Sequence, residues 1–455
     1  MFKSAPFNAY LATHHDRFLA ELGQFVAQPS VAAEKRGIQP MADLLSERFR
    51  QIGATVTQYP LPNGSPVVYA ELGQGDRTLL IYNHYDVQPE VPLDLWESPP
   101  FEMAIRDGVM YGRGIADDKG PLLARIQAVE SWQNTHGELP CRIKWIVEGE
   151  EEISSVKLPA WAEQHAAMLA ADGVYWEGGG YDALGRFTMA SGCKGIAYFE
   201  LHADGAKMDL HSSVAPIVVN SAWRLVWALN TLKDANGQIL VEGYADHVAK
   251  PSSELLAEIA TLPVDDLPVS MSHWGLKQWI DGVDDVTAQR RLLTEPTITI
   301  CGIESGYTGR GSKTVLPAHA FAKIDCRLVP DLTPEIVHGL LRAHLDKHGF
   351  GDIEIRLLGG ENPADSPGDS LVKQAAVNAF HDLWQKVPIA FPRFAGSGPM
   401  YPLSTMLGIP VINAGAIGNP NSRIHSPNEN VLERDYFEEM RFCASFLDHF
   451  ATDTW

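Results

Sequence analysis

His84 and Asp86 have the spacing of a metal ligand and the carboxylate that orients it. They directly follow an apolar run at positions 79–82 and lie two positions apart, so on an extended chain their side chains point the same way. Asp86 could accept the second N–H of the His84 imidazole, as carboxylates do behind metal-bound histidines. A single histidine at the end of a strand is more often structural than a ligand, so this pair alone predicts little.

Adjacent aspartates, Asp117 and Asp118, lie in the glycine-flanked segment GRGIADDKGP, just before an expected helix at residues 121–132. Aspartate is favoured at helix N-caps, and that is the usual interpretation of such a pair. A carboxylate held in a tight loop could instead bridge two cations. Taken alone, this motif favours the cap.

Four glutamates, at positions 148, 150, 151 and 152, directly follow the apolar run 143–147. Carboxylates this close together repel one another unless cations lie among them. A solvated charged run is the usual interpretation, but such runs rarely end a buried strand. One of these glutamates could bind a metal ion while its neighbour transfers protons.

Two further segments offer hard ligands near the end of an apolar stretch. Asp172 and Glu177 belong to the first, and His425 and Glu429 belong to the second. Each segment alone would be dismissed, but together the five segments supply two histidines and at least three carboxylates. Since sites in open α/β sheets form at the carboxyl ends of strands, the sequence predicts a metal site there.

The segments HYDVQP, YGRGIADDKGP, EGEEEISS, DLHSS and HSPNE resemble the co-catalytic zinc peptidase superfamily in order and spacing. This superfamily includes aminoacylases, glutamate carboxypeptidases, carnosinases and succinyl-diaminopimelate desuccinylases. The resemblance covers nearly the whole chain and is strongest to the carnosinase-like dipeptidase branch. It implies two divalent metal ions per chain, with zinc as the first choice and manganese or cobalt as alternatives.

The resemblance also implies a role for each matching residue. The implied metal ligands are His84, Asp117, Glu152, Glu177 and His425, with Asp117 shared by both ions. Glu177 is preferred to Asp172 as the fifth ligand, although the dipeptidase branch usually has aspartate there. Glu151 would be the general base and acid for attack by a metal-bridging hydroxide, and Asp86 would lie behind His84. The glutamate run leaves a doubt of one residue, and we place Glu151 and Glu152 directly before Ile153.

Residues outside the metal centre match as well. By the same resemblance, His211 would stabilise the oxyanion and would reach the active site of a partner subunit. Thr314, Arg327 and Ser397 would bind substrate, and Arg327 is suited to pairing with a carboxylate. Without the resemblance, His211 would be read as a surface histidine in a loop.

Expected strands and helices alternate along the chain, which predicts an α/β fold with a mostly parallel sheet and flanking helices. In the middle region the expected strands and helices follow one another in a different order, which predicts a smaller α+β sandwich that serves as a lid or dimerisation domain. We expect the catalytic domain in residues 1–193 and 363–455, and the inserted domain in residues 194–362. A homodimer is expected to form through the inserted domain.

Composition excludes several classes of partner. The formal net charge of -21 argues against nucleic acid and anionic membranes as partners. No apolar run approaches the roughly 18 residues of a membrane span, and the first residues lack the pattern of a secretory signal. The five scattered cysteines form no CxxC pair, so we expect them to be buried in a reducing compartment. These features predict a cytoplasmic protein.

The sequence therefore predicts a hydrolase that cleaves the amide bond of dipeptides or of C-terminal residues of small peptides. A deacylase of N-acyl amino acids is the main alternative, because it needs the same metal centre and Glu177 mildly favours it. A non-catalytic binding protein is a weaker alternative, since the ligand and base positions are all filled. The segment 306–314 nearly spells a phosphate loop, but Ser312 interrupts the motif and no helix clearly follows, so we reject nucleotide binding.

Overall fold

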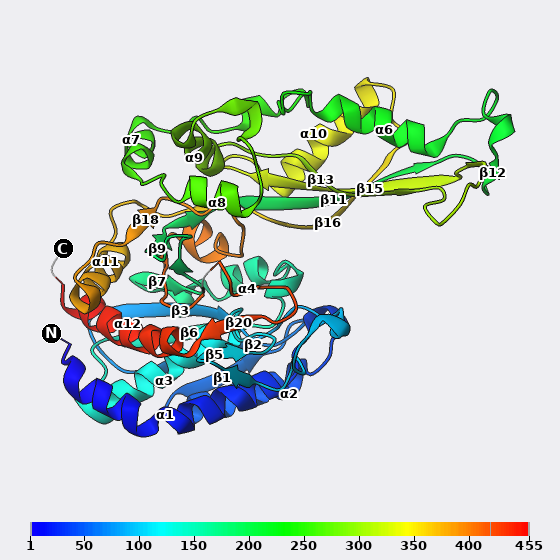
Figure 1. Ribbon diagram of the computed structural model, residues 1–455. Helices are drawn as coiled ribbons and strands as arrows, with labels where there is room; N and C mark the ends of the chain where they lie inside the picture. The colour runs from blue at the N-terminus through cyan, green and yellow to red at the C-terminus, as the bar shows by residue number, and fades with distance from the viewer. Residues whose placement is uncertain (1, 419, 454–455) are drawn as a thin grey trace.

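The computed structural model describes residues 2–418 and 420–453 and shows a larger and a smaller part stacked on one another (Figure 1). The larger part contains a nine-stranded sheet with the order β1-β2-β6-β3-β7-β19-β9-β18, in which β8 also pairs with β9. Its strands are β1 (Thr55–Tyr59), β2 (Val67–Leu72), β3 (Thr78–His84), β6 (Arg142–Glu148), β7 (Gly173–Trp176), β8 (Gly180–Tyr181), β9 (Phe187–Ala190), β18 (Ile389–Phe391) and β19 (Val411–Asn413).

The centre of this sheet is parallel. Strands β6, β3, β7 and β19 run in the same direction. At one edge of the sheet, β2 pairs antiparallel with β6, and β1 pairs antiparallel with β2. The parallel strands are buried almost throughout, which is why they appear in the sequence as continuous apolar runs. Their carboxyl ends meet at one edge of the sheet and bring the residues that follow them together.

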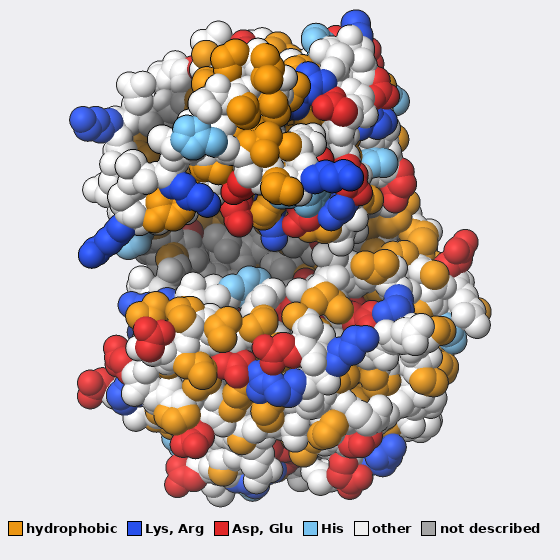
Figure 2. Space-filling model, turned by 90° about the vertical axis from the view of Figure 1, so that its right-hand side faces the viewer, with side chains coloured by type: hydrophobic (Ala, Val, Ile, Leu, Met, Phe, Trp, Pro, Cys, Tyr) orange, Lys and Arg blue, Asp and Glu red, His pale blue; other side chains and the backbone are white. Residues whose placement is uncertain are grey.

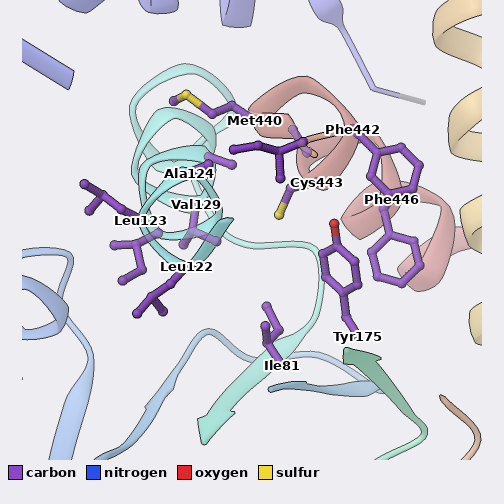
Figure 3. Packing of buried hydrophobic residues seen from close by; sticks show 14 of the residues in the cluster. Ile81, Leu122, Leu123, Ala124, Val129, Tyr175, Met440, Phe442, Cys443 and Phe446 are labelled. Carbon is purple, nitrogen blue, oxygen red and sulfur yellow. The ribbon is translucent and has the colours of Figure 1, made fainter. Parts of the chain in front are cut away.

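Helices cover both faces of the large sheet. They are α1 (Ser4–Ala27), α2 (Ile38–Gln51), α3 (Lys119–His136), α4 (Leu158–Gln164), α5 (Ala166–Leu169), α11 (Leu371–Trp384) and α12 (Glu433–Thr452). Figure 3 shows the main core, where Ala124 of α3 lies near Met440 of α12, with Ile81 and Tyr175 of the sheet below them. Helix α3 is buried on most sides because it is packed between the sheet and other helices.

The smaller part is built on a four-stranded antiparallel sheet with the order β13-β15-β11-β16. Its strands are β11 (Gly195–Asp204), β13 (Thr299–Ser305), β15 (His319–Leu328) and β16 (Glu354–Glu361). Burial alternates along β11 and β15, and the buried side chains pack beneath α6 (Ser221–Leu232) and α10 (Pro334–Lys347) in a separate hydrophobic core. The other face of this sheet is turned toward the larger part (Figure 1).

Short elements complete the chain. They are β4 (Ala104–Arg106), β5 (Val109–Tyr111), β10 (Gly192–Cys193), β12 (Leu210–His211), β14 (Val315–Leu316), β17 (Ala364–Asp365), β20 (Asn430–Leu432), α7 (Ser253–Thr261), α8 (Leu267–His273) and α9 (Asp285–Thr294). Strands β10 and β17 pair where the chain passes between the two parts. This pairing lies next to the predicted domain limits at residues 193 and 362, which stay a prediction.

The predicted fold class is confirmed, and one local expectation needs correction. The segment 253–294, for which no helix was predicted, forms the three short helices α7, α8 and α9. Cys301 lies exposed on the edge strand β13, so the expectation of buried cysteines holds for the other four only. Among the described helices, none is long and apolar enough to cross a membrane.

Candidate metal centre and active site

His84 lies at the carboxyl end of β3 with its ring buried. Its Nδ1 is 3.0 Å from the backbone oxygen of Asp86 and 3.4 Å from Asp86 Oδ1. Its Nε2 is 2.9 Å from Asp117 Oδ1 and 3.7 Å from Glu177 Oε2. Asp86 thus fixes the Nδ1 side of the imidazole, and Nε2 points at the carboxylates of Asp117 and Glu177.

His425 approaches the same aspartate from the other side. Its Nε2 lies 2.9 Å from Asp117 Oδ2 and 3.1 Å from Glu152 Oε2. The two oxygens of Asp117 therefore face two different imidazoles. Two sets of donors result, one with His84 and Glu177 and one with His425 and Glu152, and Asp117 is common to both.

The glutamate run is sorted by its contacts. Glu148 accepts hydrogen bonds from Tyr82 and Ser155, and Glu150 pairs with Lys157 at 2.9 Å. Neither carboxylate contacts the two donor sets described above. The structure thus leaves Glu151 and Glu152 at the cluster, which is the register chosen from the sequence.

Asp86 also holds this turn in place. Its two carboxylate oxygens accept hydrogen bonds from the backbone N–H groups of Glu151 and Glu152, at 3.2 and 3.1 Å. The Glu152 carboxylate is fixed separately by Gln88, whose Nε2 donates to Glu152 Oε2 at 2.9 Å. Asp86 therefore positions both the imidazole of His84 and the glutamate pair.

Glu177 and Asp172 lie at opposite ends of β7. Asp172 precedes the strand, and its Oδ2 accepts a hydrogen bond from the N–H of Thr78 at 2.7 Å, where β3 begins. Glu177 follows the strand and joins His84. Its Oε2 is buried and has no hydrogen-bond partner among the described residues. Such an unsatisfied oxygen beside an imidazole and a second carboxylate fits a metal ligand.

The pKa shifts of the clustered side chains also favour a metal site. Burial raises the pKa of Glu151 and of Glu177 well above the usual value for glutamate. Burial also raises the pKa of Asp117, but His425 and His84 outweigh it and hold that pKa low. Burial lowers the pKa of His425, yet Asp117 and Glu152 bring it to about 10. Carboxylates packed this closely in a buried place need positive charge, which divalent cations would supply.

Three residues that were given no role from the sequence support the cluster. Asp118 accepts hydrogen bonds from Asn83 Nδ2 at 2.7 Å and from the His84 N–H at 3.1 Å, and burial raises the pKa of Asp118 to about 7. Glu429 accepts from the N–H groups of Gly114, Ala116 and Asp117 and pairs with Arg113. Gln88 is the third. Two of these residues lie in motifs already noted in the sequence: Asp118 belongs to ADDKG and Glu429 to HSPNE.

A second group of possible ligands lies in the smaller part. Glu242, His344 and His348 offer ligand atoms within 4.8 Å of one another. Lys347 Nζ lies 3.0 Å from the Glu242 carboxylate and already balances its charge. No Lys or Arg among the described residues pairs with Asp117, Glu152 or Glu177, so the cluster around Asp117 is the better candidate for a metal centre.

The predicted substrate residues fall into two places. Arg327 Nη1 donates to Ser397 Oγ at 3.0 Å, which joins the smaller sheet to the loop at residues 396–398. A Cβ placed on Gly398 would lie 3.9 Å from Glu151 Oε1, so this loop borders the cluster. His211 and Thr314 instead lie together at the far tip of the smaller part, with Thr314 Oγ1 3.2 Å from His211 Nε2. No described contact joins either of them to the cluster in the same chain.

The segment 306–314 is followed directly by strand β14. A phosphate loop requires a helix at this point, because the helix N-terminus binds the phosphates. The rejection of nucleotide binding from the sequence agrees with this arrangement.

A shared carboxylate between two imidazoles at the carboxyl ends of a parallel sheet, with a free glutamate beside them, is the arrangement of a metal-dependent hydrolase. A family model described as Peptidase family M20/M25/M40 matches residues 80–449, so the chain belongs to this family. The resemblance inferred from the sequence motifs is confirmed, and the chain is a metallopeptidase that groups with the dipeptidase branch.

Relatives of established name are similar over most of their length. The chain is 32% identical to the Cys-Gly metallodipeptidase dug1 of Schizosaccharomyces pombe over 360 residues, which cover 73% of each chain. It is 27% identical to the Beta-Ala-His dipeptidase of Rattus norvegicus, over 96% of this chain and 94% of the relative.

Solved structures show the same fold. The M20 family metallo-carboxypeptidase Sso-CP2 from Sulfolobus solfataricus matches with a TM-score of 0.88 and 37% identity, over 95% of this chain and 99% of that chain. Human carnosine dipeptidase 1 matches with a TM-score of 0.84 and 26% identity, over 98% and 99% of the two chains.

Proposed function

We propose that this metallopeptidase is a two-metal dipeptidase that cleaves the amide bond next to a free carboxylate. The observation that carries the proposal is Asp117, whose two oxygens each lie 2.9 Å from a different histidine. The names of the relatives, Cys-Gly metallodipeptidase and Beta-Ala-His dipeptidase, support the substrate class. The proposal includes a related activity, the removal of C-terminal residues from small peptides. The name of a similar solved structure, a metallo-carboxypeptidase, supports this activity.

His84, Asp117 and Glu177 would hold one divalent ion, and His425, Asp117 and Glu152 would hold the other. These imidazole and carboxylate donors suit zinc, and manganese or cobalt would also be accepted. Bound ions would supply Lewis acidity at the scissile carbonyl and at the attacking water.

Glu151 is the general base and acid in this proposal. Its carboxylate makes no hydrogen bond with any described residue, and it lies beside Glu152 and the loop at residues 396–398. It would accept the proton of the attacking water and pass it to the leaving nitrogen. Arg327, held near Ser397, would pair with the substrate carboxylate.

We also propose that residues 194–362 form a lid domain through which two chains dimerise. Trp223 and Trp227 of α6 stack on one another and are more than half exposed. Ile300 and Ile303 are exposed on β13, an edge strand of the sheet that α6 covers. Figure 2, which views the molecule from the right-hand side of Figure 1, shows hydrophobic side chains gathered on the smaller part at the top of the picture. Exposed hydrophobic surfaces of this kind mark interfaces. A cytoplasmic location remains a prediction.

In such a dimer His211 and Thr314 would act on the partner's site. We expect His211→Ala to lower kcat by about 10²- to 10³-fold, the usual effect of removing an oxyanion donor. Co-expression with Glu151→Gln provides the sharper measurement. Each mixed dimer then holds one site with an intact Glu151 and an intact His211 from the other chain, so activity should return. Activity no higher than in either variant alone would contradict action across the dimer.

The first test of the proposed function is elemental analysis together with hydrolysis of dipeptides and N-acetyl amino acids. We expect about two divalent ions per chain, chelator-sensitive cleavage, and faster turnover of dipeptides. Faster turnover of N-acetyl amino acids would favour the deacylase alternative, which the glutamate at position 177 supports. A chain that binds no metal and stays inactive with zinc, manganese or cobalt would be a binding protein on this fold.

A further inference from the structure

Glu361, the last residue of β16, is a partly buried carboxylate to which no role has been given so far. No described residue makes a hydrogen bond or an ion pair with it. Burial raises the pKa of Glu361 to about 7, and the more distant charge of Arg327 only partly opposes this effect. A carboxylate without a partner in such a place is costly, so a cationic ligand would stabilise it.

The strand register places Glu361 and Arg327 on the same face of the smaller sheet. Ile196 of β11 is paired with Arg327 of β15 on one side and with Glu361 of β16 on the other. Directly opposed residues of antiparallel strands project from the same face. With strands about 4.8 Å apart, the backbone positions of Arg327 and Glu361 are separated by roughly 10 Å.

This face is turned toward the candidate catalytic centre. The neighbouring residues Ala197 and Cys326 point the other way, into the core beneath α6 and α10. Arg327 contacts Ser397, one residue from the Gly398 backbone that borders Glu151.

We propose that Glu361 binds the free α-ammonium group of the substrate while Arg327 binds its carboxylate. An extended dipeptide spans about 7 Å, which fits between two charged side chains that project from positions roughly 10 Å apart. The inference rests on the proposed function and names its substrate class. The substrates are zwitterionic dipeptides, and N-acyl amino acids lack the group that Glu361 recognises.

A pair of substrates that differ only in the ammonium group tests this assignment. Ala-Leu and propionyl-Leu share the scissile bond, and a hydrogen replaces the amine in the second. For Glu361→Gln we expect kcat/KM for Ala-Leu to fall about 10- to 100-fold, the range for a lost hydrogen bond to a charged group, and that for propionyl-Leu to stay unchanged. Glu354→Gln is the matched control, because Glu354 is exposed at the other end of β16 and pairs with Arg356.

Equal losses on both substrates, or no loss on either, would overturn the role of Glu361. The wild-type enzyme provides a second measurement that does not depend on folding of the variant. It should cleave Ala-Leu at least 10-fold more efficiently than propionyl-Leu. Equal cleavage of both would overturn the ammonium site and leave a two-metal hydrolase, whereas cleavage of neither, nor of any dipeptide in a broader panel, would overturn the proposed function as well.

Discussion

Glu151→Gln is expected to lower kcat by about 10²- to 10⁴-fold, the contribution typical of general acid–base catalysis, without loss of metal. Glutamine keeps the size of the side chain but cannot accept the proton of the attacking water. The backbone N–H of Glu151 still donates to Asp86, so the turn that carries Glu152 should stay in place. Steady-state kinetics and elemental analysis of the same preparation measure the two effects separately.

The neighbouring glutamate provides a matched control. Glu150 is one residue away but pairs with Lys157 and accepts a hydrogen bond from the N–H of Ser65. Glu150→Gln should therefore keep kcat near that of the wild type and should lower the melting temperature instead. If Glu150→Gln were inactive and Glu151→Gln were active, the general base would be misassigned by one residue.

Glu177→Ala is expected to remove one of the two metal ions and most of the activity. The side chain of Glu177 is buried beside His84, and its Oε2 has no other partner among the described residues. Loss of groups that only support a ligand weakens metal binding about 10- to 100-fold, so loss of a ligand should exceed that range. Equilibrium dialysis against zinc followed by elemental analysis would show about one ion per chain.

Asp172→Asn is the control for the ligand choice. Asp172 accepts a hydrogen bond from the Thr78 N–H at the opposite end of β7, so its substitution should leave metal content and kcat unchanged. Loss of a metal ion in Asp172→Asn, with Glu177→Ala fully loaded, would reverse the assignment.

The central sheet could be predicted because its strands leave a local signal. Strands β3 and β6 are buried along nearly their whole length, so each is a continuous apolar run in the sequence, and each ends in polar residues. The helices α7 to α9 were missed because each spans only seven to ten residues and is mostly exposed, so its apolar pattern is too short to stand out in the sequence. The expected strands and helices of the middle region predicted the smaller α+β part but not which residues face one another across its sheet.

The candidate site was predictable in its residue types and less so in its arrangement. The order and spacing of the motifs, through their resemblance to a known family, indicated which histidines and carboxylates belong together. The choice between Glu177 and Asp172 depends on which end of β7 each residue occupies, and the register of Glu150 to Glu152 depends on partners such as Ser65. These contacts join residues far apart in the chain, so no local pattern reports them.

The sequence by itself determined the α/β fold, the inserted sheet and the metallopeptidase family, because apolar runs and spaced ligands are local features. Only the tertiary structure brought the two oxygens of Asp117 between His84 and His425. It also aligned Arg327 and Glu361 across Ile196 and placed His211 far from the candidate metal ligands of its own chain. Strand pairing and domain placement decide these distances. Both depend on packing between segments far apart in the chain, as in the contacts His425–Asp117 and Thr314–His211, which each join residues more than 100 positions apart.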